Sequence, residues 1–321
     1  MIARRGLLAT PALMSPAWAQ SWPARTITLI VPFAAGGNVD TVARLAASEL
    51  SRRLGQTVVV ENAPGAGGTI GTERAARANP DGHTLLIGVE SPFTISPVVT
   101  PSAVRYDPLR DFAPVGMLAS LPLTLVGRPD LPAADMAGLL ALARTRPDGL
   151  TYATSGTGTS LHLWGEIIAR RLGVKLEHVP YRIAAQIPTD LIAGRLDLAV
   201  LTITTTAPLL RDGRIKGFAV SSLEAHPALP NLPPLAALPE FAGFEMLAWQ
   251  AVFAPSRTDP AILRRLATEL DAMHADAEFR ARLTQIGMTP WRRTPEELTM
   301  LLRSDLARYE EVVRLGNIRA E

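Results

Sequence analysis

Residues 26–38 read TITLIVPFAAGGN, and this stretch decides the fold class. Its first six residues are β-branched or apolar and predict a strand, which Pro32 and the following glycines end. From Asn38 the apolar side chains change to a helical period, beginning with Val39 and Val42 on one face. A strand, a glycine-rich turn and a helix therefore follow one another directly, with Gly55 expected to stop the helix.

The same alternation continues along the chain. A strand at residues 58–61, a glycine loop at 62–68, a helix to about residue 78 and a strand at 84–89 complete a parallel α/β unit. A second unit follows, with strands predicted at residues 150–154, 176–179, 196–201 and 217–220, and helices at 135–145, 161–172 and 188–193.

Two long β-type runs, residues 115–126 and 244–253, stand at either end of the second unit. They predict two lobes joined by two crossovers, each lobe a mainly parallel sheet flanked by helices, with a ligand cleft between the lobes. Two amphipathic helices at the end of the chain should return to the first lobe. The expected division is residues 1–19 as a signal peptide, 20–121 plus 245–321 as lobe one, and 122–244 as lobe two.

Composition narrows the functional classes. The 321 residues are 47% hydrophobic, and 32 basic against 30 acidic residues give a formal charge of +2. This balance gives no support for nucleic-acid binding. The chain has no cysteine, which excludes disulfides, thiolate catalysis and Cys-ligated metals.

The N-terminus predicts export. A short basic segment ends at Arg5, residues 6–14 are mostly apolar, and Ala17-Trp18-Ala19 is a small-x-small cleavage pattern before Gln20. These features are typical of a secretory signal peptide cleaved near Ala19-Gln20. No later stretch has the ~18 uninterrupted apolar residues of a membrane span, so the mature chain is expected not to cross a membrane.

Two uncharged, glycine-rich turns each open a helix, one per unit. The first is residues 32–38, and the second reads SGTGTS at Ser155 to Ser160. Ligands of open α/β sheets bind where strands end. The free N–H groups and the dipole of a helix start favour an anion there. The two turns therefore predict an anion site between the lobes.

Other chemistries fit these turns less well. No lysine follows either turn as a P-loop requires, and Ser155 lacks the G-x-S-x-G spacing of a nucleophile elbow. A hydrolase using Ser155 or Ser160 with His162 remains an alternative, although no acid is indicated. The five histidines are scattered without ligand spacing, so neither a metal nor a cofactor is expected.

Polar residues at other strand ends are further candidates for the cleft. Glu90 and Ser91 follow the strand at residues 84–89, and Tyr181-Arg182 follows that at 176–179. Arg182 could pair bidentately with a carboxylate. Thr202 follows the strand at 196–201, whereas Trp249 is interpreted as core or hinge packing.

The motifs, in order, resemble a known family. They are VPFAAGGNVD, VVVENAPGAGGTIG, NPDGHTLLIG, DFAPVGML, LTYATSGTGTSLHL, HVPYR, LIAGRLDLAV and FAVSS with HPALPNLPPLAAL. This order is similar to that of the Bug-type periplasmic receptors of tripartite tricarboxylate transporters, from about Trp22 to Ile318.

The resemblance implies a two-lobed periplasmic-binding-protein fold that closes on a small carboxylate. Recognition would use backbone N–H groups and waters in loops matching residues 33–40 and 155–162. It also implies a periplasmic location, no catalysis, and transient delivery of ligand to integral-membrane transporter subunits by a protein that we expect to be a monomer. The candidate ligand-binding residues are Phe33, Ala34, Ala35, Gly36, Gly37, Asn38, Asp40, Glu90, Ser91, Ser155, Gly156, Thr157, Gly158, Thr159, Ser160, His162, Tyr181, Arg182 and Thr202.

This sequence departs from the family pattern at positions that would set ligand identity. Ala34-Ala35 replaces a proline pair, Tyr181-Arg182-Ile183 replaces Y-K-G, and Thr202-Ile203 replaces an acidic-amide pair. Glu90 stands where the family often has asparagine or another neutral residue. In the cleft it would repel a second carboxylate, or pair with an amine or with Arg182.

Three functions remain open on the sequence. The leading one is a solute receptor. A ligand-sensing input protein for a membrane sensor kinase would look the same in this sequence. The Ser/His hydrolase is the third.

Overall fold

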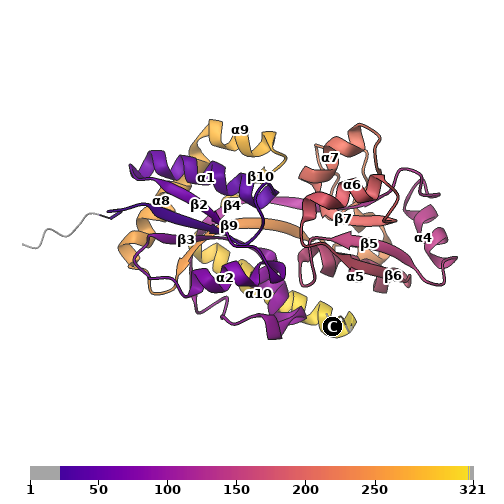
Figure 1. Cartoon of the computed structure of the whole chain (residues 1–321), viewed down its shortest axis with the longest axis horizontal. Coiled ribbons are helices and arrows are strands. Elements are labelled where there is room, and N and C mark those ends of the chain that lie inside the picture. Colours follow the sequence, from indigo (N-terminus) through magenta and orange to yellow (C-terminus); the bar gives the residue numbers. More distant parts are fainter. Residues whose placement is uncertain (1–21, 317, 319–321) are drawn as a thin grey trace, which may run out of the picture.

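The computed structural model describes residues 22–316 and residue 318. The predicted signal peptide, residues 1–19, lies outside the described residues. Figure 1 shows two bodies, each a sheet with helices around it, connected by the long strands β4 (Phe112–Gly127) and β9 (Leu247–Pro255). The predicted two-lobed α/β fold is confirmed. We call the body that holds β1 to β3 lobe one, and the body that holds β5 to β7 lobe two.

Lobe one is built from alternating strands and helices, as the first unit of the sequence predicts. Its elements are β1 (Ile27–Val31), α1 (Asn38–Leu54), β2 (Val58–Asn62), η1 (Ala66–Gly68), α2 (Thr69–Ala76), β3 (Thr84–Val89), η2 (Ser91–Ile95), α3 (Ser96–Val99) and η3 (Pro101–Ala103). The end of the chain adds α8 (Pro260–Ala275), α9 (Ala277–Gln285), β10 (Thr289–Pro290) and α10 (Pro295–Gly316).

Lobe two repeats the alternation with smaller elements. They are α4 (Met136–Arg144), β5 (Leu150–Thr154), α5 (Ser160–Leu172), β6 (Leu176–Pro180), η4 (Ala184–Gln186), α6 (Ile187–Ile192), β7 (Leu198–Thr202), α7 (Ile203–Arg211), β8 (Lys216–Val220), η5 (Leu235–Ala237) and η6 (Pro239–Phe241).

The strands form one continuous sheet in the order β2-β1-β3-β9-β4-β7-β5-β6, with β8 and β10 also paired to β4. Strand β1 is parallel to β2 and β3, and β5 is parallel to β6 and β7, whereas β4 and β9 run antiparallel to their neighbours. Strand β4 pairs with β9 as far as Pro122 and with β7 from Leu123 onward. This change of partner supports the lobe boundary that we propose between residues 121 and 122.

Glycines end the two helices whose first turns face the other lobe. Gly55 closes α1 and Gly173 closes α5, with φ of 67° and 62° respectively. Only glycine adopts this left-handed conformation without a steric cost from Cβ, so both helices stop where the sequence predicts.

Helix α7 is the main element that the sequence analysis missed. Its sequence, ITTTAPLLR, contains three threonines and Pro208, all of which disfavour a helix locally. The helix forms because it packs on β4 and buries Ile203 and Ala207. Burial against β4 therefore outweighs the low helix propensity of this segment. As a result, α7 begins beside the cleft.

Aromatic side chains fill the core of lobe one below the cleft. The ring of Phe93 in η2 stacks on Phe253 of β9, with ring centroids 4.2 Å apart. Trp249 packs against the same group and is buried, in agreement with its interpretation as a core residue. This packing fixes the segment after β3 against the crossover strand.

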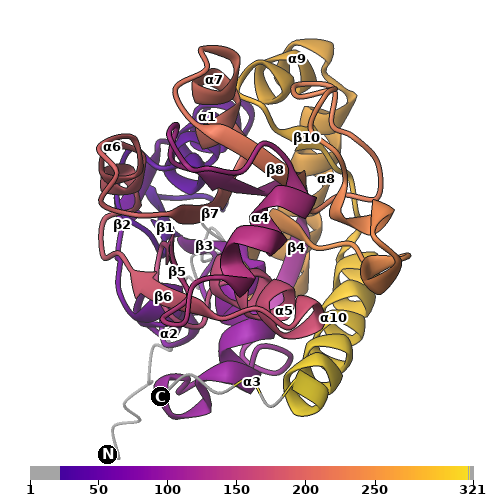
Figure 2. The same cartoon turned by 90° about the vertical axis from the view of Figure 1, so that its right-hand side faces the viewer.

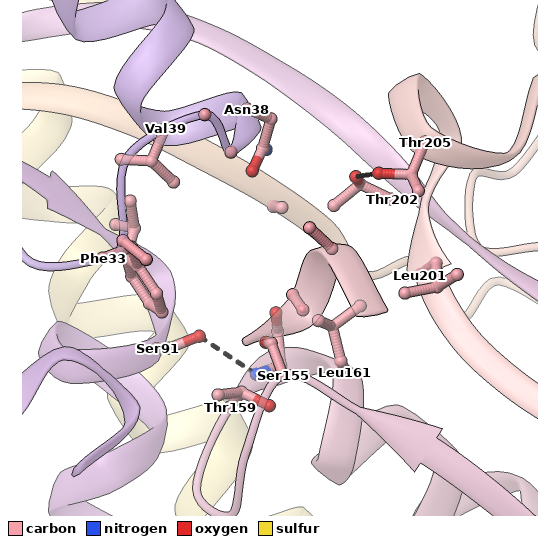
Figure 3. A pocket seen from close by; sticks show the side chains of 18 of the residues that line it. Phe33, Asn38, Val39, Ser91, Ser155, Thr159, Leu161, Leu201, Thr202 and Thr205 are labelled. Carbon is pink, nitrogen blue, oxygen red and sulfur yellow. Dashed lines mark hydrogen bonds between the residues drawn. The ribbon is translucent and has the colours of Figure 1, made fainter. Parts of the chain in front are cut away.

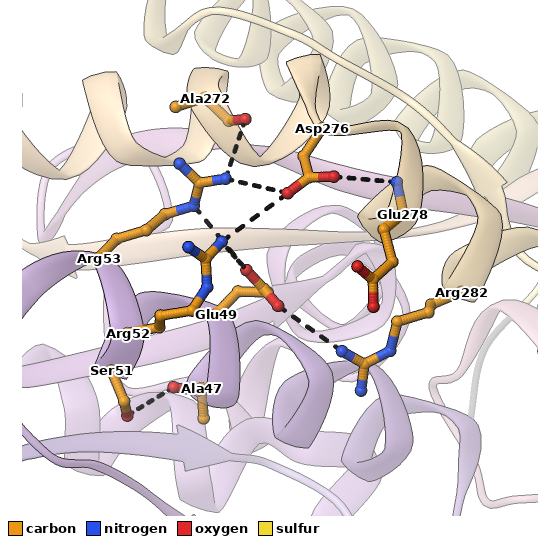
Figure 4. Close-up of polar contacts among 9 residues, drawn as sticks. All are labelled: Ala47, Glu49, Ser51, Arg52, Arg53, Ala272, Asp276, Glu278 and Arg282. Carbon is orange, nitrogen blue, oxygen red and sulfur yellow. Dashed lines mark hydrogen bonds and ion pairs between the residues drawn. The ribbon is translucent and has the colours of Figure 1, made fainter.

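The last helices return to lobe one, as the sequence predicts. Helix α8 packs on α1 and β4, and α10 runs along β4 and reaches α5 of lobe two (Figure 2). An ion-pair network joins α1 to the α8–α9 corner (Figure 4). In it, Glu49 lies 2.8 Å from Arg52 and 3.6 Å from Arg282, and Asp276 lies 3.5 Å from Arg53.

Candidate functional site

A cavity of about 380 Å³ lies between the lobes, where β1, β3, β5 and β7 end. Its size suits a small metabolite. The predicted residues that line it are Phe33, Ala34, Ala35, Gly36, Gly37, Asn38, Glu90, Ser91, Ser155, Thr159, Ser160, Arg182 and Thr202. The predicted residues that do not line it are Asp40, Gly156, Thr157, Gly158, His162 and Tyr181.

The start of α1 forms one wall of the cavity. Gly37 precedes the helix and provides no side-chain cap, so the first backbone N–H groups, including that of Asn38, lack a partner within the helix. Asn38 and Val39 both line the cavity. This wall therefore offers N–H donors and the positive end of a helix dipole.

Asp40 supports this wall from behind instead of facing a ligand. Its Oδ2 accepts hydrogen bonds from the Gly36 N–H (3.0 Å) and Arg44 Nε (2.9 Å), and its Oδ1 accepts one from Asn62 Nδ2 (3.0 Å). Burial acts to raise the pKa of Asp40. The hydrogen bonds from Arg44, Gly36 and Asn62 outweigh it and hold the pKa below its ordinary value. The carboxylate fixes the turn that opens α1.

The start of α7 forms the facing wall. Thr202 precedes the helix without capping it, because its Oγ1 hydrogen-bonds to the hydroxyls of Thr204 (3.0 Å) and Thr205 (3.3 Å). Figure 3 shows Thr202 and Thr205 across the cavity from Asn38. Two helix starts thus open on the same end of the cavity, and the sequence analysis anticipated only one of them.

The SGTGTS turn differs from its predicted role. The Ser160 N–H donates to Ser91 Oγ (3.1 Å), and Ser160 Oγ donates to Glu90 Oε1 (2.6 Å). Thr159 Oγ1 donates to the Gly156 carbonyl (2.7 Å) and accepts from the His162 N–H (3.2 Å). These donors are therefore already hydrogen-bonded within the protein. The Ser155 hydroxyl lines the cavity and has no hydrogen bond to another described residue.

Gly158 of this turn faces lobe one. Ser96 Oγ donates to the Gly158 carbonyl (3.1 Å), and a Cβ added at Gly158 would lie 2.9 Å from Thr100 Oγ1. Close approach of the two lobes requires a residue without a side chain here. This contact with Ser96 and Thr100 explains why Gly158 does not line the cavity.

Glu90 joins lobe one, lobe two and the crossover strand. It is 4% exposed, its Oε1 accepts from Ser160 Oγ, and its Oε2 accepts from the Trp249 N–H (3.0 Å). Burial raises the pKa of Glu90, although the hydrogen bonds from Ser160 and Trp249 act in the opposite direction. Of the alternatives for Glu90, the pairing with Arg182 does not occur within the described residues; the carboxyl group instead accepts from Ser160 and Trp249.

His162 is a structural residue below the SGTGTS turn. Its Nδ1 accepts from the Gly158 N–H (3.4 Å), and its ring lies 4.2 Å from that of His178. Burial lowers the pKa of His162 to about 4. Within residues 22–316, no serine hydroxyl is hydrogen-bonded to His162.

Tyr181 and Arg182 point to different places. The Tyr181 hydroxyl donates to Asp190 Oδ2 (2.7 Å) and so lies away from the cavity. Arg182 is exposed and lines the cavity, and it makes no ion pair with any residue of the described part. It is the lining cation that remains available to a ligand.

Several lining residues are not among those predicted from the sequence. Most are apolar: Val39, Val89, Leu161, Ile183, Ala184, Ala185, Pro188, Leu201, Ala248 and Trp249; Thr205 and Gln250 are polar. Gln250 is 1% exposed, and its amide nitrogen and oxygen have no hydrogen-bond partner among the described residues. Gln250 lies in a hydrophobic run that predicts a buried strand, so the sequence did not indicate that it lines a cleft.

Two kinds of feature are absent from the described residues. Over the described residues, no group of three or more His, Asp or Glu side chains is placed to hold a metal ion. In the same part of the chain, no helix has the length and apolar character needed to cross a membrane.

Known proteins share this sequence and architecture. The family model described as tripartite tricarboxylate transporter family receptor matches residues 42–318. The protein BugT of Bordetella pertussis is 34% identical over 311 residues, which cover 96% of this chain and 94% of BugT.

Solved structures of similar proteins cover almost the whole chain. Rpa4515 of R. palustris, solved with adipate, has a TM-score of 0.87 at 33% identity, and the match covers 93% of this chain and 100% of that chain. MatC (Rpa3494) from Rhodopseudomonas palustris, with bound malate, has a TM-score of 0.84 at 33% identity, covering 91% and 100%. The chain therefore belongs to the tripartite tricarboxylate transporter family receptors, as a periplasmic binding protein of the Bug type.

Proposed function

We propose that this protein is a periplasmic receptor that binds a small carboxylate between its lobes and delivers it to a tripartite tricarboxylate-type membrane transporter. The observation that carries the proposal is the pair of helix starts, α1 and α7, that open uncapped on one end of the cavity. Their N–H groups and dipoles favour a carboxylate. Similar proteins were solved with adipate and malate, which supports this ligand class.

The lining charges support the same conclusion. Arg182 adds a cation to the lining of the same cavity, and the neutral side chains of Asn38, Thr202 and Thr205 add hydrogen-bonding groups. Most other lining residues are apolar, as is usual for a small-molecule site with a few orienting polar groups.

The proposal includes no catalysis. Ser160 Oγ donates to Glu90 and His162 Nδ1 accepts from Gly158, so neither group is arranged for a serine–histidine mechanism. We further propose that the signal peptide is removed near Ala19-Gln20 and that the mature protein acts as a monomer. Transient contact with transporter subunits would then release the ligand.

The experiment is native mass spectrometry of the mature protein for a co-purified ligand, followed by thermal melts with mono- and dicarboxylates. A bound carboxylate should raise Tm by an amount that grows with its concentration over Kd. The ligand should be recovered unchanged after incubation. Turnover that is lost in Ser155→Ala would contradict the receptor proposal, and so would the failure of every carboxylate to bind.

A further inference from the structure

Glu90 is a buried acidic residue in the lining of the cavity. Figure 3 shows Asn38, Thr202 and Thr205 toward one end of the cavity, and Ser91, Ser155 and Thr159 toward the other. Glu90 belongs to this second end through its contact with Ser160 at the start of α5. A helix start favours an anion, and here the carboxyl group of Glu90 occupies the place beside the start of α5.

The donors that Ser160 and Trp249 bring to this second end are hydrogen-bonded within the protein. Ser160 Oγ and the Trp249 N–H donate to the two oxygens of Glu90, and the Ser160 N–H donates to Ser91. A second ligand carboxylate would therefore lose its water without gaining these hydrogen bonds. If Glu90 is ionised, it would also meet a like charge. The position beside Ser160 is filled in either protonation state of Glu90.

The other end of the cavity is free to accept an anion. The starts of α1 and α7 are not capped by their preceding residues, and Arg182 has no ion pair within the described part of the chain. Between the two ends the lining is mainly apolar, with Phe33, Leu161 and Leu201 among its members. The cavity therefore offers one anion site and an apolar remainder.

We propose that the ligand of this receptor carries a single carboxylate, held where α1 and α7 begin, and an uncharged, mainly apolar body that extends toward Glu90. This inference rests on the proposed carboxylate-receptor function and narrows its ligand class. Ser155 leaves room for one neutral polar group, such as a hydroxyl or carbonyl, at the second end.

The test compares three six-carbon acids that differ only at the far end: hexanoate, adipate and 6-aminohexanoate. Isothermal titration calorimetry with the mature protein should show hexanoate binding at least ~10-fold more tightly than adipate, because the Ser155 hydroxyl alone would replace only a small part of the water that the second carboxylate loses. Hexanoate should also bind more tightly than 6-aminohexanoate. Equal or tighter binding of adipate or of 6-aminohexanoate would overturn the inference.

The variant Glu90→Gln tests the cause. Its amide can accept from the Trp249 N–H and donate to Ser160 Oγ, which frees the Ser160 O–H for a ligand and removes the negative charge. We expect adipate affinity to rise about tenfold and hexanoate affinity to stay within about twofold. The matched control is Asp305→Asn, because Asp305 is also a buried carboxyl group but does not line the cavity. An equal gain in the control would show a general charge effect and contradict the role of Glu90.

The co-purified ligand gives a test that does not depend on any variant. A ligand with one carboxylate supports the inference. One with two or three carboxylates overturns it and leaves the receptor proposal intact. If no carboxylate binds and none co-purifies, the receptor proposal itself fails, and the inference fails with it.

Discussion

At the scale of single residues, side chains that look alike in the sequence have different tasks. Asp40 and Glu90 are both buried carboxyl groups near helix starts. Asp40 ties its own turn together, whereas Glu90 reaches Ser160, seventy residues further along the chain. The first contact is local and could be anticipated from spacing, but the second depends on how the lobes meet.

Arg182 should strengthen carboxylate binding modestly. We expect Arg182→Ala to weaken binding by about 1 kcal/mol, or about fivefold, because the side chain is exposed and water screens its charge. Titration calorimetry with the best-binding acid would measure the change. Arg214→Ala, an exposed arginine of the same lobe outside the cavity, should leave affinity unchanged. Equal loss in both variants would show that only net charge matters.

Gln250 should lower the stability of the ligand-free protein. Its amide is buried without a partner in the described structure, so Gln250→Met, which keeps the unbranched shape, should add about 1–2 kcal/mol to the free energy of unfolding. Thermal melts should show Tm raised by about 2–6 °C. Gln250→Glu should lower Tm, because it buries a charge. A lower Tm for Gln250→Met would mean that the amide has a partner.

At the scale of elements, two helix starts make the proposed anion site, and the sequence predicts only one of them. Residues 32–38 show the strand, turn and helix of β1 and α1 plainly, including the stop at Gly55. The threonines and the proline of α7 have low helix propensity, so its sequence does not predict a helix. The helix forms because it packs on β4. Propensity is a local and weak bias, so burial decides such cases.

Asp40 makes the turn before α1 sensitive to acid. Because its pKa is lowered in the folded state, its contribution is complete above its ordinary value of 3.8 and is lost as pH falls through the lower folded value. We expect the Tm difference between wild type and Asp40→Ala to be constant between about pH 7 and 5 and to shrink below about pH 4. Thermal melts across this range measure it. A difference that grows on acidification would contradict the assigned hydrogen bonds.

At the scale of the whole molecule, the chain leaves lobe one through β4, returns through β9 and completes lobe one with its last helices (Figure 1). Both crossover strands belong to the sheet that joins the lobes, and β9 also forms part of the cavity wall. This is why Ala248, Trp249 and Gln250 line the cavity although they lie within a buried strand.

The ion-pair network of Glu49 should stabilise the return of the terminal helices (Figure 4). Glu49 lies among Arg52, Arg53 and Arg282, so Glu49→Gln leaves three guanidinium groups without their shared partner. We expect a loss of about 1 kcal/mol at most in the free energy of unfolding at low salt, because Glu49 and Arg53 are largely buried whereas Arg52 and Arg282 are exposed and screened by water. Urea denaturation at low and high ionic strength would show a smaller loss at high salt. A loss that does not depend on salt would indicate packing instead.

The sequence by itself determined the α/β alternation, the two-lobed fold, the glycines that end α1 and α5, and the family. These properties follow from local periodicity, from backbone conformations that glycine alone adopts easily, and from motifs in a fixed order. Only the tertiary structure decided which hydrogen-bonding groups remain available in the cavity. The Ser160 donors are taken by Glu90 and Ser91, α7 supplies an unanticipated helix start, and Gln250 is buried without a partner. The physical reason is that a hydrogen bond between distant residues depends on the packing of whole elements, which local patterns do not record.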